Sequence, residues 1–186
     1  FDITGIPMSA EPEFVRAFGY VKKAAAQANR DLKVLEPEVA DAIIHACDLL
    51  IAGQYREQFV TDFIQGGAGT STNMNANEVI ANLALEHLGH SKGQYHIVSP
   101  NDHVNYGQST NDVYPTAFRL ALILRLTAYS EALQQLQAAF FKKAREFDRV
   151  LKMGRTHLQD AVPMSLGQEF HGWGTTIGEE VQRIAE

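Results

Sequence analysis

Three stretches of the sequence place hydroxyl and amide side chains close to apolar-rich segments: Thr70 and Ser71; Ser109, Thr110 and Asn111; Thr156 and His157. All but His157 are neutral hydrogen-bonding groups. Such a set can orient carboxylates and stabilise the negative charge that develops when a proton leaves the adjacent carbon. An imidazole side chain such as that of His157 can hold a leaving group or transfer a proton to it. We therefore predict a site for a small dicarboxylate, with Thr156 and His157 as its catalytic members.

The second cluster precedes the longest apolar-rich segment of the chain. Asn111 or Asp112 is predicted to cap a helix there through a side-chain oxygen, and Pro115 is tolerated in the first turn because it needs no N–H partner. Free N–H groups and the positive end of the helix dipole favour anions at a helix N-terminus. A carboxylate or a phosphate is therefore the ligand expected here.

The first cluster lies in a glycine-rich loop, residues 66–75. Its glycines permit close approach of the backbone to a ligand, and Asn75 with Glu78 is predicted to form a capping box for a helix through Leu88. A nucleotide-binding loop is excluded, because no lysine follows Gly69 and the third glycine of a dinucleotide loop is missing.

Four histidines, His87, His90, His96 and His103, follow this loop. Neither a cysteine nor a glutamate in a zinc-hydrolase pattern accompanies them, so they are predicted to lie at the surface or at the edge of the core. We expect no metal and no cofactor.

Helical periodicity indicates the elements that must position these clusters. Apolar stripes are predicted at Phe14, Ala17, Phe18, Val21, Ala24 and Ala25 (helix 13–29), at Val39, Ile43, Ala46, Cys47 and Leu50 (helix 37–50), and at Ile80, Leu83, Ala84, His87 and Leu88. Residues 58–65 show too little periodicity to assign, and a short extended piece is possible there.

Residues 113–147 predict a single helix, roughly 50 Å long at about 1.5 Å per residue. Its apolar surface exceeds what the short helices of one chain can cover, so a bundle of several subunits is expected. A last helix is predicted from near Ser165 to the end, and its glycines (Gly167, Gly172, Gly174 and Gly178) indicate close helix packing. The predicted fold class is all-α: a mostly helical domain, 1–108, followed by the start of a long-helix bundle, 109–186.

Composition narrows the classes of partner. Sixteen basic and 22 acidic residues give a net charge of −6 without a basic run, which excludes nucleic acid as a partner. No apolar run reaches the roughly 20 residues of a membrane span, and the single cysteine, Cys47, fits a reducing, cytoplasmic location. The first residue is not Met and the helical pattern is unbroken at Glu186, so we expect the chain to be part of a longer protein.

The three clusters, read as GGAGTSTNMNANEVIAN, SPNDHVNYGQSTNDVYPTAFRLA and MGRTHLQDAVPMSLGQEF, resemble the conserved regions of the aspartase/fumarase superfamily in the same order. The resemblance covers most of the chain. Gly69-Thr70-Ser71, residues 109–112 and Ala161-Val162-Pro163 are similar to the aspartase branch, whereas Gly172-Trp173 is similar to fumarase and His157 fits both.

The resemblance implies an all-α homotetramer in which three subunits build each active site. It assigns Thr70, Ser109, Thr110, Asn111, Thr156 and His157 to substrate binding. A base removes the C3 proton of L-aspartate, and the resulting aci-carboxylate expels ammonia to leave fumarate. That base is a serine in a loop of the form GSSxMPxKxNP, expected beyond residue 186. Two alternatives stay open: a class II fumarase, and a non-catalytic helical oligomerisation module whose polar loops only cap helices.

Overall fold

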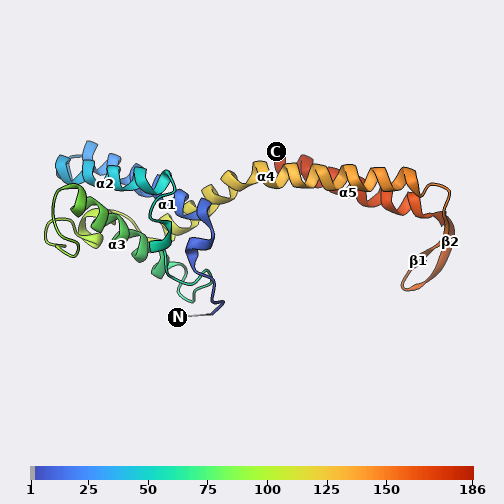
Figure 1. Ribbon diagram of the computed structural model, residues 1–186, viewed down its shortest axis with the longest axis horizontal. Coiled ribbons are helices and arrows are strands. Elements are labelled where there is room, and N and C mark those ends of the chain that lie inside the picture. The colour runs from blue at the N-terminus through green and yellow to red at the C-terminus, as the bar shows by residue number, and fades with distance from the viewer. Residues whose placement is uncertain (1–2) are drawn as a thin grey trace. The chain divides into compact units, whose positions relative to one another are not determined.

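A computed structural model describes residues 3–186 and divides the chain into two compact units. The first unit ends at Leu124 and the second is Arg125–Glu186, so the division falls within the long helix α4 (Thr110–Glu146; Figure 1). The boundary predicted after residue 108 lies ahead of that helix. As a domain boundary of the whole protein it stays a prediction.

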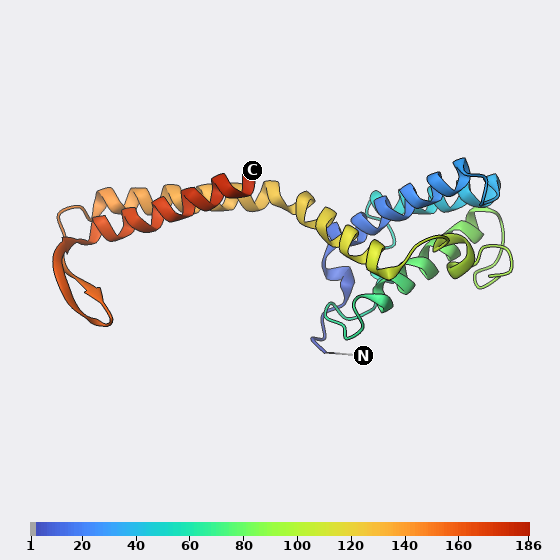
Figure 2. The same ribbon diagram turned by 180° about the vertical axis from the view of Figure 1, so that it is seen from behind.

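Helices build the first unit. In chain order they are the 3-10 turn η1 (Met8–Ala10), α1 (Pro12–Asp31), α2 (Pro37–Ile51), the 3-10 turn η2 (Arg56–Gln58), α3 (Thr70–His87), the π-helical turn η3 (Pro100–Val104) and the first part of α4. A proline opens both α1 and α2, where its missing N–H costs no helical hydrogen bond. Helices α1 and α2 lie side by side, and α3 packs on α2 (Figures 1 and 2).

The core of this unit is formed by fully buried apolar side chains, among them Phe18, Ile43, Leu50, Ile80 and Leu85. The stripe predicted on α2 is confirmed, with Val39 partly buried and the other four members fully buried. Cys47 belongs to that stripe and its thiol is free and buried. The predicted helices 13–29 and 37–50 are therefore correct within about two residues at each end.

Two predicted stripes are wrong in part. On α1 the buried face runs through Phe14, Phe18, Lys22 and Ala26, whereas Ala24 is exposed. Successive steps of four residues keep one face of a helix toward the core, and Lys22 takes the place on that face where an apolar side chain would be expected. On α3, His87 is exposed and instead stacks on His45, with 4.0 Å between the ring centres.

The predicted helix caps are also wrong. Helix α3 begins at Thr70, directly after Gly69, so Asn75 lies inside it; the Asn75 side chain accepts from the Val60 N–H (3.0 Å) and donates to the Gln58 carbonyl (3.0 Å). These bonds tie the preceding loop to the helix.

Helix α4 begins at Thr110, three residues before the predicted start. Ser109, not Asn111 or Asp112, provides the capping oxygen, because Ser109 Oγ accepts from the Asn111 N–H (3.2 Å). Polar residues that favour caps are also tolerated within the first two turns of a helix, so both helices begin before the residues that were predicted to cap them.

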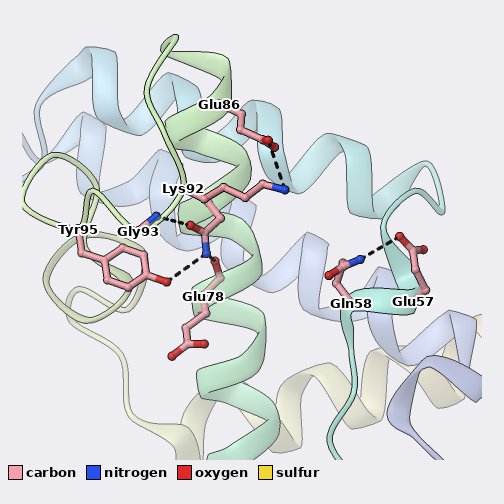
Figure 3. A network of polar contacts seen from close by, with 8 residues as sticks. Glu57, Gln58, Glu78, Glu86, Lys92, Gly93 and Tyr95 are labelled. Atoms are coloured by element: carbon pink, nitrogen blue, oxygen red, sulfur yellow. Dashed lines mark hydrogen bonds and ion pairs between the residues drawn. The ribbon is translucent and has the colours of Figure 1, made fainter.

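The loop after α3 returns along that helix (Figure 3). Asn82 accepts from the Gly93 N–H (2.9 Å) and donates to Tyr95 Oη (3.1 Å), and Lys92 pairs with Glu86 (3.3 Å). Gly89, at φ +80°, starts this loop, where a glycine adopts the left-handed backbone that follows the helix. The loop then leads into η3 and the start of α4.

The second unit is a helical hairpin with a β-hairpin at its turn. The last part of α4 is followed by β1 (Leu151–Thr156), β2 (Gln159–Ser165) and α5 (Leu166–Ala185), and α5 runs back along α4 (Figures 1 and 2). The strands pair antiparallel, with Leu151 opposite Ser165 and Thr156 opposite Gln159. The all-α class is confirmed, but the hairpin replaces what was predicted only as a polar cluster.

Close packing of α5 on α4 explains most of the glycines in α5. A Cβ on Gly167 would lie 2.4 Å from the Ala144 carbonyl oxygen, and one on Gly174 would lie 2.8 Å from the Phe141 ring. Gly178 faces Gln137 in the same way, whereas Gly172 has open space around it, so the packing prediction fails for Gly172 alone. The predicted start near Ser165 is confirmed by a capping box with Gln168.

Large apolar side chains remain exposed on α4 within the first unit. Phe118, Leu122 and Ile123 are 46%, 48% and 62% exposed. This is the surface that the sequence predicts one chain cannot cover. Among residues 3–186, no helix combines the length and the apolar character that crossing a membrane requires.

Burial of Lys22 predicts a pH-dependent stability. Burial lowers the pKa of Lys22 from 10.5 to about 7, although nearby Cys47 opposes the shift. Between these values the unfolded chain holds a proton that the folded chain has released, so the free energy of unfolding rises with pH. Between pH 7 and pH 9 we expect the free energy of unfolding of the wild type to rise by about 2 kcal/mol more than that of the Lys22→Met variant, measured by urea unfolding.

The prediction is limited to pH 9 because above that pH the titration of Cys47 lowers the free energy of unfolding, opposite to the effect of Lys22. Burial raises the pKa of the Cys47 thiol to about 12, so above pH 9 the unfolded chain loses a proton that the folded chain keeps. Lys23→Met is the matched control: Lys23 is partly exposed and pairs with Asp48 at 2.6 Å. It should keep the pH slope of the wild type, and a slope that survives in Lys22→Met would contradict the assignment.

Candidate functional site

Gly69 allows the start of α3 to approach α4. It is buried at φ +86°, and a Cβ there would lie 2.2 Å from the ring of Tyr114 in the first turns of α4. The Tyr114 ring also packs edge-on against Phe14 and Phe18, with centroids 5.4 and 6.3 Å away. The first and second polar clusters are therefore held against one another by the core.

A hydrogen bond joins the two clusters directly. Asn73, one turn into α3, donates through Nδ2 to Thr110 Oγ1 at 3.2 Å, although 37 residues separate them. Asn73 is buried and Thr110 is partly buried. The N-termini of α3 and α4 thus lie together, and each contributes the positive end of a helix dipole to the same region.

The remaining hydroxyls of these clusters are accessible. Thr70, Ser71, Ser109 and Asn111 are all exposed, and Thr70 Oγ1 donates to the Gly67 carbonyl at 3.0 Å. Ser71 lines a cavity of about 460 Å³ with Thr61, Asp62, Gln65 and Gly66, among others. A small polar ligand can therefore reach the start of α3.

Asp62 at the wall of this cavity is committed to backbone bonds. Its carboxylate accepts from the N–H groups of Ile3, Thr4, Gly5 and Ile64 at 2.8–3.1 Å. Burial alone would raise the pKa of Asp62, but these bonds and one from the Thr4 hydroxyl lower it below its ordinary value. The carboxylate consequently fixes the chain's first described residues against the cavity.

The third cluster lies on the β-hairpin of the second unit. Thr156 closes the strand pair with Gln159, and His157 and Leu158 form the two-residue turn, at φ +50° and +61°. All three of Thr156, His157 and Leu158 are exposed, and Leu158 is 96% exposed. Left-handed backbone at two non-glycine residues is a strained conformation of the kind that clusters at functional sites.

The structure thus brings together Thr70, Ser71, Ser109, Thr110 and Asn111 in the first unit, and places Thr156 and His157 side by side in the second. The chemistry available in the first unit is binding: hydroxyls, amides and helix N-termini that favour an anion. The imidazole of His157, a side-chain type that is able to transfer a proton, belongs to the hairpin.

The four histidines after the glycine-rich loop lie at the surface or at the edge of the core, as predicted for the group, although His87 was also predicted on the apolar stripe of α3. His87, His90 and His96 are exposed, and His103 is partly buried, where its Nδ1 accepts from the Ser99 N–H (3.0 Å). Within residues 3–186, no three His, Cys, Asp or Glu side chains are arranged to hold a metal ion.

Sequence reasoning missed a buried polar cluster behind the start of α4, made of Lys22, Asn73, Asn77, Asn105 and Gln108. One signal was available. Lys22 stands four residues after Phe18 and four before Ala26, so it lies on the apolar stripe of α1. A lysine at such a position is seldom buried without a specific partner.

Comparisons with known proteins agree with this architecture. A family model described as Lyase matches residues 6–186. An aspartate ammonia-lyase of Pseudomonas aeruginosa is 57% identical over 184 residues, which are 99% of this chain and 39% of that protein. The chain therefore spans about two fifths of the length of the curated relatives it matches.

Two solved structures show the same fold over 98% of the chain. A structure described as fumarate lyase:delta crystallin from Brucella melitensis superposes with a TM-score of 0.84 at 55% identity, and 43% of that chain is covered. A class II fumarase from Schistosoma mansoni gives a TM-score of 0.77 at 39% identity, with 38% of that chain covered.

Proposed function

The chain belongs to the lyase family, and on that basis we propose that the whole protein is an aspartate ammonia-lyase, which converts L-aspartate to fumarate and ammonia. The identity of 57% to an aspartate ammonia-lyase, against 39% to a class II fumarase, supports this choice. The structural observation that carries it is the Asn73–Thr110 bond, which joins two helix N-termini rich in hydroxyls and amides. Such a region favours a substrate that bears carboxylates.

In the proposed reaction these groups bind and orient the substrate. Thr70, Ser71, Ser109, Thr110 and Asn111 receive a carboxylate, and their hydrogen bonds strengthen as negative charge accumulates on the substrate. A base takes the C3 proton, and the electron pair moves into the adjacent carboxylate to give the aci-carboxylate. Collapse of that intermediate forms the C2–C3 double bond and expels the amino group from C2.

Thr156 and His157 are proposed to serve the same reaction from the hairpin. His157 holds the departing nitrogen or supplies its proton, and Thr156 adds a hydroxyl to the binding set. The base itself is proposed to be a serine beyond residue 186. The strained, exposed turn at His157 supports a role in which its side chain is presented outward.

A homotetramer with shared active sites completes the proposal. The exposed Phe118, Leu122 and Ile123 on α4 support association, because a soluble chain seldom leaves such a surface open. Light scattering on residues 1–186 should show an oligomer. A separate assay of the same residues with aspartate should detect no release of ammonia. A well-folded monomer would contradict the association, and deamination by these residues alone would contradict the placement of the base.

Product analysis tests the reaction itself. The full-length protein should form aspartate when it is incubated with fumarate and ammonia. With fumarate and water alone it should form no malate. Malate without aspartate would instead support the fumarase alternative, which the fumarase-like pair Gly172-Trp173 favours. If Thr156→Ala and His157→Ala both left turnover intact, the hairpin would have no part in the chemistry and the oligomerisation-module alternative would gain.

Replacing Asn111 tests whether the start of α4 faces the substrate. Asn111 is exposed in the first helical turn, where a negative charge is favourable for the helix, so Asn111→Asp should fold normally. The added charge opposes a dicarboxylate, and we expect KM for aspartate to rise about tenfold or more at low ionic strength. An unchanged KM in the full-length variant would remove Asn111 from the site.

We also propose a cytoplasmic location. The free, buried thiol of Cys47 supports it, because a reducing compartment is where single unpaired cysteines are ordinary.

A further inference from the structure

The side chain of Lys22 is fully buried on α1 and has no place in the binding set described above. Its Nζ donates to Oδ1 of Asn105 and to Oε1 of Gln108, each at 3.0 Å. Both acceptors are neutral amides, so these bonds do not neutralise the charge of a protonated lysine. A buried cation held in this way is costly for folding, and groups of this kind are enriched where they serve function.

The two amides that hold Lys22 also shape the turn that leads into α4. Asn105 Nδ2 donates to the Gln108 carbonyl at 3.1 Å, and Gln108 Nε2 donates to the carbonyl of Val104 at 2.9 Å. Gln108 directly precedes Ser109, the residue that caps α4. The amino group of Lys22 therefore donates to both side chains that brace the start of the helix.

Helix α3 reaches the same amide from the other side. Asn73 and Asn77 donate through Nδ2 to Asn105 Oδ1, at 3.2 and 3.1 Å, and Asn73 Nδ2 also donates to Thr110 Oγ1 at 3.2 Å. A continuous path of hydrogen-bonded side chains thus runs from Lys22 through Asn105 and Asn73 to Thr110.

The cluster has more acceptor capacity than its bonds use. Asn73 Oδ1 and Asn77 Oδ1 are both buried, and neither has a hydrogen-bond partner among residues 3–186. Buried amide oxygens of this kind favour a hydrogen-bond donor in their midst, and an apolar side chain at position 22 would remove the Lys22 donor from Gln108 Oε1 and from Asn105 Oδ1, which would keep its bonds from Asn73 and Asn77.

We propose that Lys22 is a positioning residue, which acts through Asn105 and Asn73 to hold Thr110 and the first turn of α4 in the geometry that receives a carboxylate. The inference rests on the proposed function, because only a carboxylate-binding Thr110 gives this positioning a consequence for turnover. Lys22 itself does not contact the substrate.

The first experiment measures the positioning without any use of activity. Amide hydrogen exchange is followed at residues 109–113 of the 186-residue chain in Lys22→Met and in Lys23→Met, the neighbouring lysine that pairs with Asp48. Exchange should become about tenfold faster in Lys22→Met and stay unchanged in Lys23→Met. Equal exchange in the two variants overturns the proposal.

The second experiment uses the full-length protein with aspartate. Lys22→Met should raise KM about tenfold while kcat changes less than threefold, because the loss falls on the binding of a carboxylate and not on the proton transfer. Lys23→Met should keep both constants. A loss confined to kcat, or a KM equal to that of the wild type, overturns the role in substrate binding.

A third variant covers the case in which Lys22→Met does not fold. Asn73→Ala removes the link to Thr110 and leaves both bonds of Lys22 in place, and it should loosen residues 109–113 in the same way. Unchanged exchange there overturns the proposal. If the full-length wild type turns over neither aspartate nor fumarate, the proposed function fails, while the exchange result still decides whether Lys22 positions the helix.

Discussion

Gly69→Ala is expected to destabilise the first unit by about 2–4 kcal/mol and to lower its melting temperature by about 10 °C. Two costs combine. An L-residue at φ +86° is strained, and the new methyl group would overlap the Tyr114 ring, which Phe14 and Phe18 hold in place. Thermal unfolding followed by circular dichroism measures the loss.

Gly66→Ala is the matched control from the same loop. It has open space around it and no positive φ, so its effect should stay within about 0.5 kcal/mol. A double-mutant cycle with Tyr114→Ala isolates the steric part of this loss. Once the ring is removed, Gly69→Ala should lower the free energy of unfolding by less than it does in the wild type. Strict additivity would show that Tyr114 does not press on Gly69.

Gly167→Ala is expected to have a comparable effect on the second unit, about 2–4 kcal/mol. Its Cβ would lie 2.4 Å from the Ala144 carbonyl oxygen and 2.8 Å from Cα of Asp148, and backbone atoms cannot turn aside as a side chain can. The start of α5 would have to move away, and this movement would strain the hydrogen bond from the N–H of residue 167 to the Phe147 carbonyl. Faster amide exchange along α5 reports the change.

Gly172→Ala provides the contrast within the same helix. Nothing lies near its Cβ, so an alanine should stabilise α5 by about 0.5–1 kcal/mol through its better helix propensity. Gly178→Ala should be milder than Gly167→Ala, since the end of the flexible Gln137 side chain can move. Equal losses at positions 167 and 172 would mean that close packing is not the reason for these glycines.

The helices were predictable because their apolar spacing is regular, but the starts of α3 and α4 were not. Hydroxyl and amide residues read as caps at Asn75 and Asn111, but both lie inside helices that begin earlier. Such side chains favour caps, but they also fit the first two turns of a helix when a loop or a neighbouring helix offers a partner. Asn75 illustrates this, because its amide bonds to the loop at Gln58 and Val60.

The β-hairpin carried none of the usual signals in the sequence. Its turn is His157-Leu158, whereas two-residue turns with left-handed backbone normally contain Asn-Gly or Asp-Gly. Pro163 within β2 also argued against a strand, although it sits opposite Met153 in a two-stranded sheet where a missing donor is tolerated.

The candidate site was predictable by residue type and not by contact. Thr70 and Thr110 stand out as hydroxyls near the ends of apolar segments, and this holds without any knowledge of the fold. Their proximity depends on Asn73, Gly69 and Tyr114, whose partners lie tens of residues away in the chain. Lys22 was missed because a lysine on an apolar stripe is normally assigned to the helix surface.

Because Cys47 is buried, its reaction with a thiol reagent can report the separation of the helices around it. The thiolate is the form that reacts with iodoacetamide, and a fully buried thiol with a pKa of about 12 supplies almost none of it at neutral pH. Alkylation of the intact fold therefore waits for the helices around Cys47 to separate. Because the sequence has a single cysteine, each alkylated molecule in a mass spectrum records one opening of that helical core.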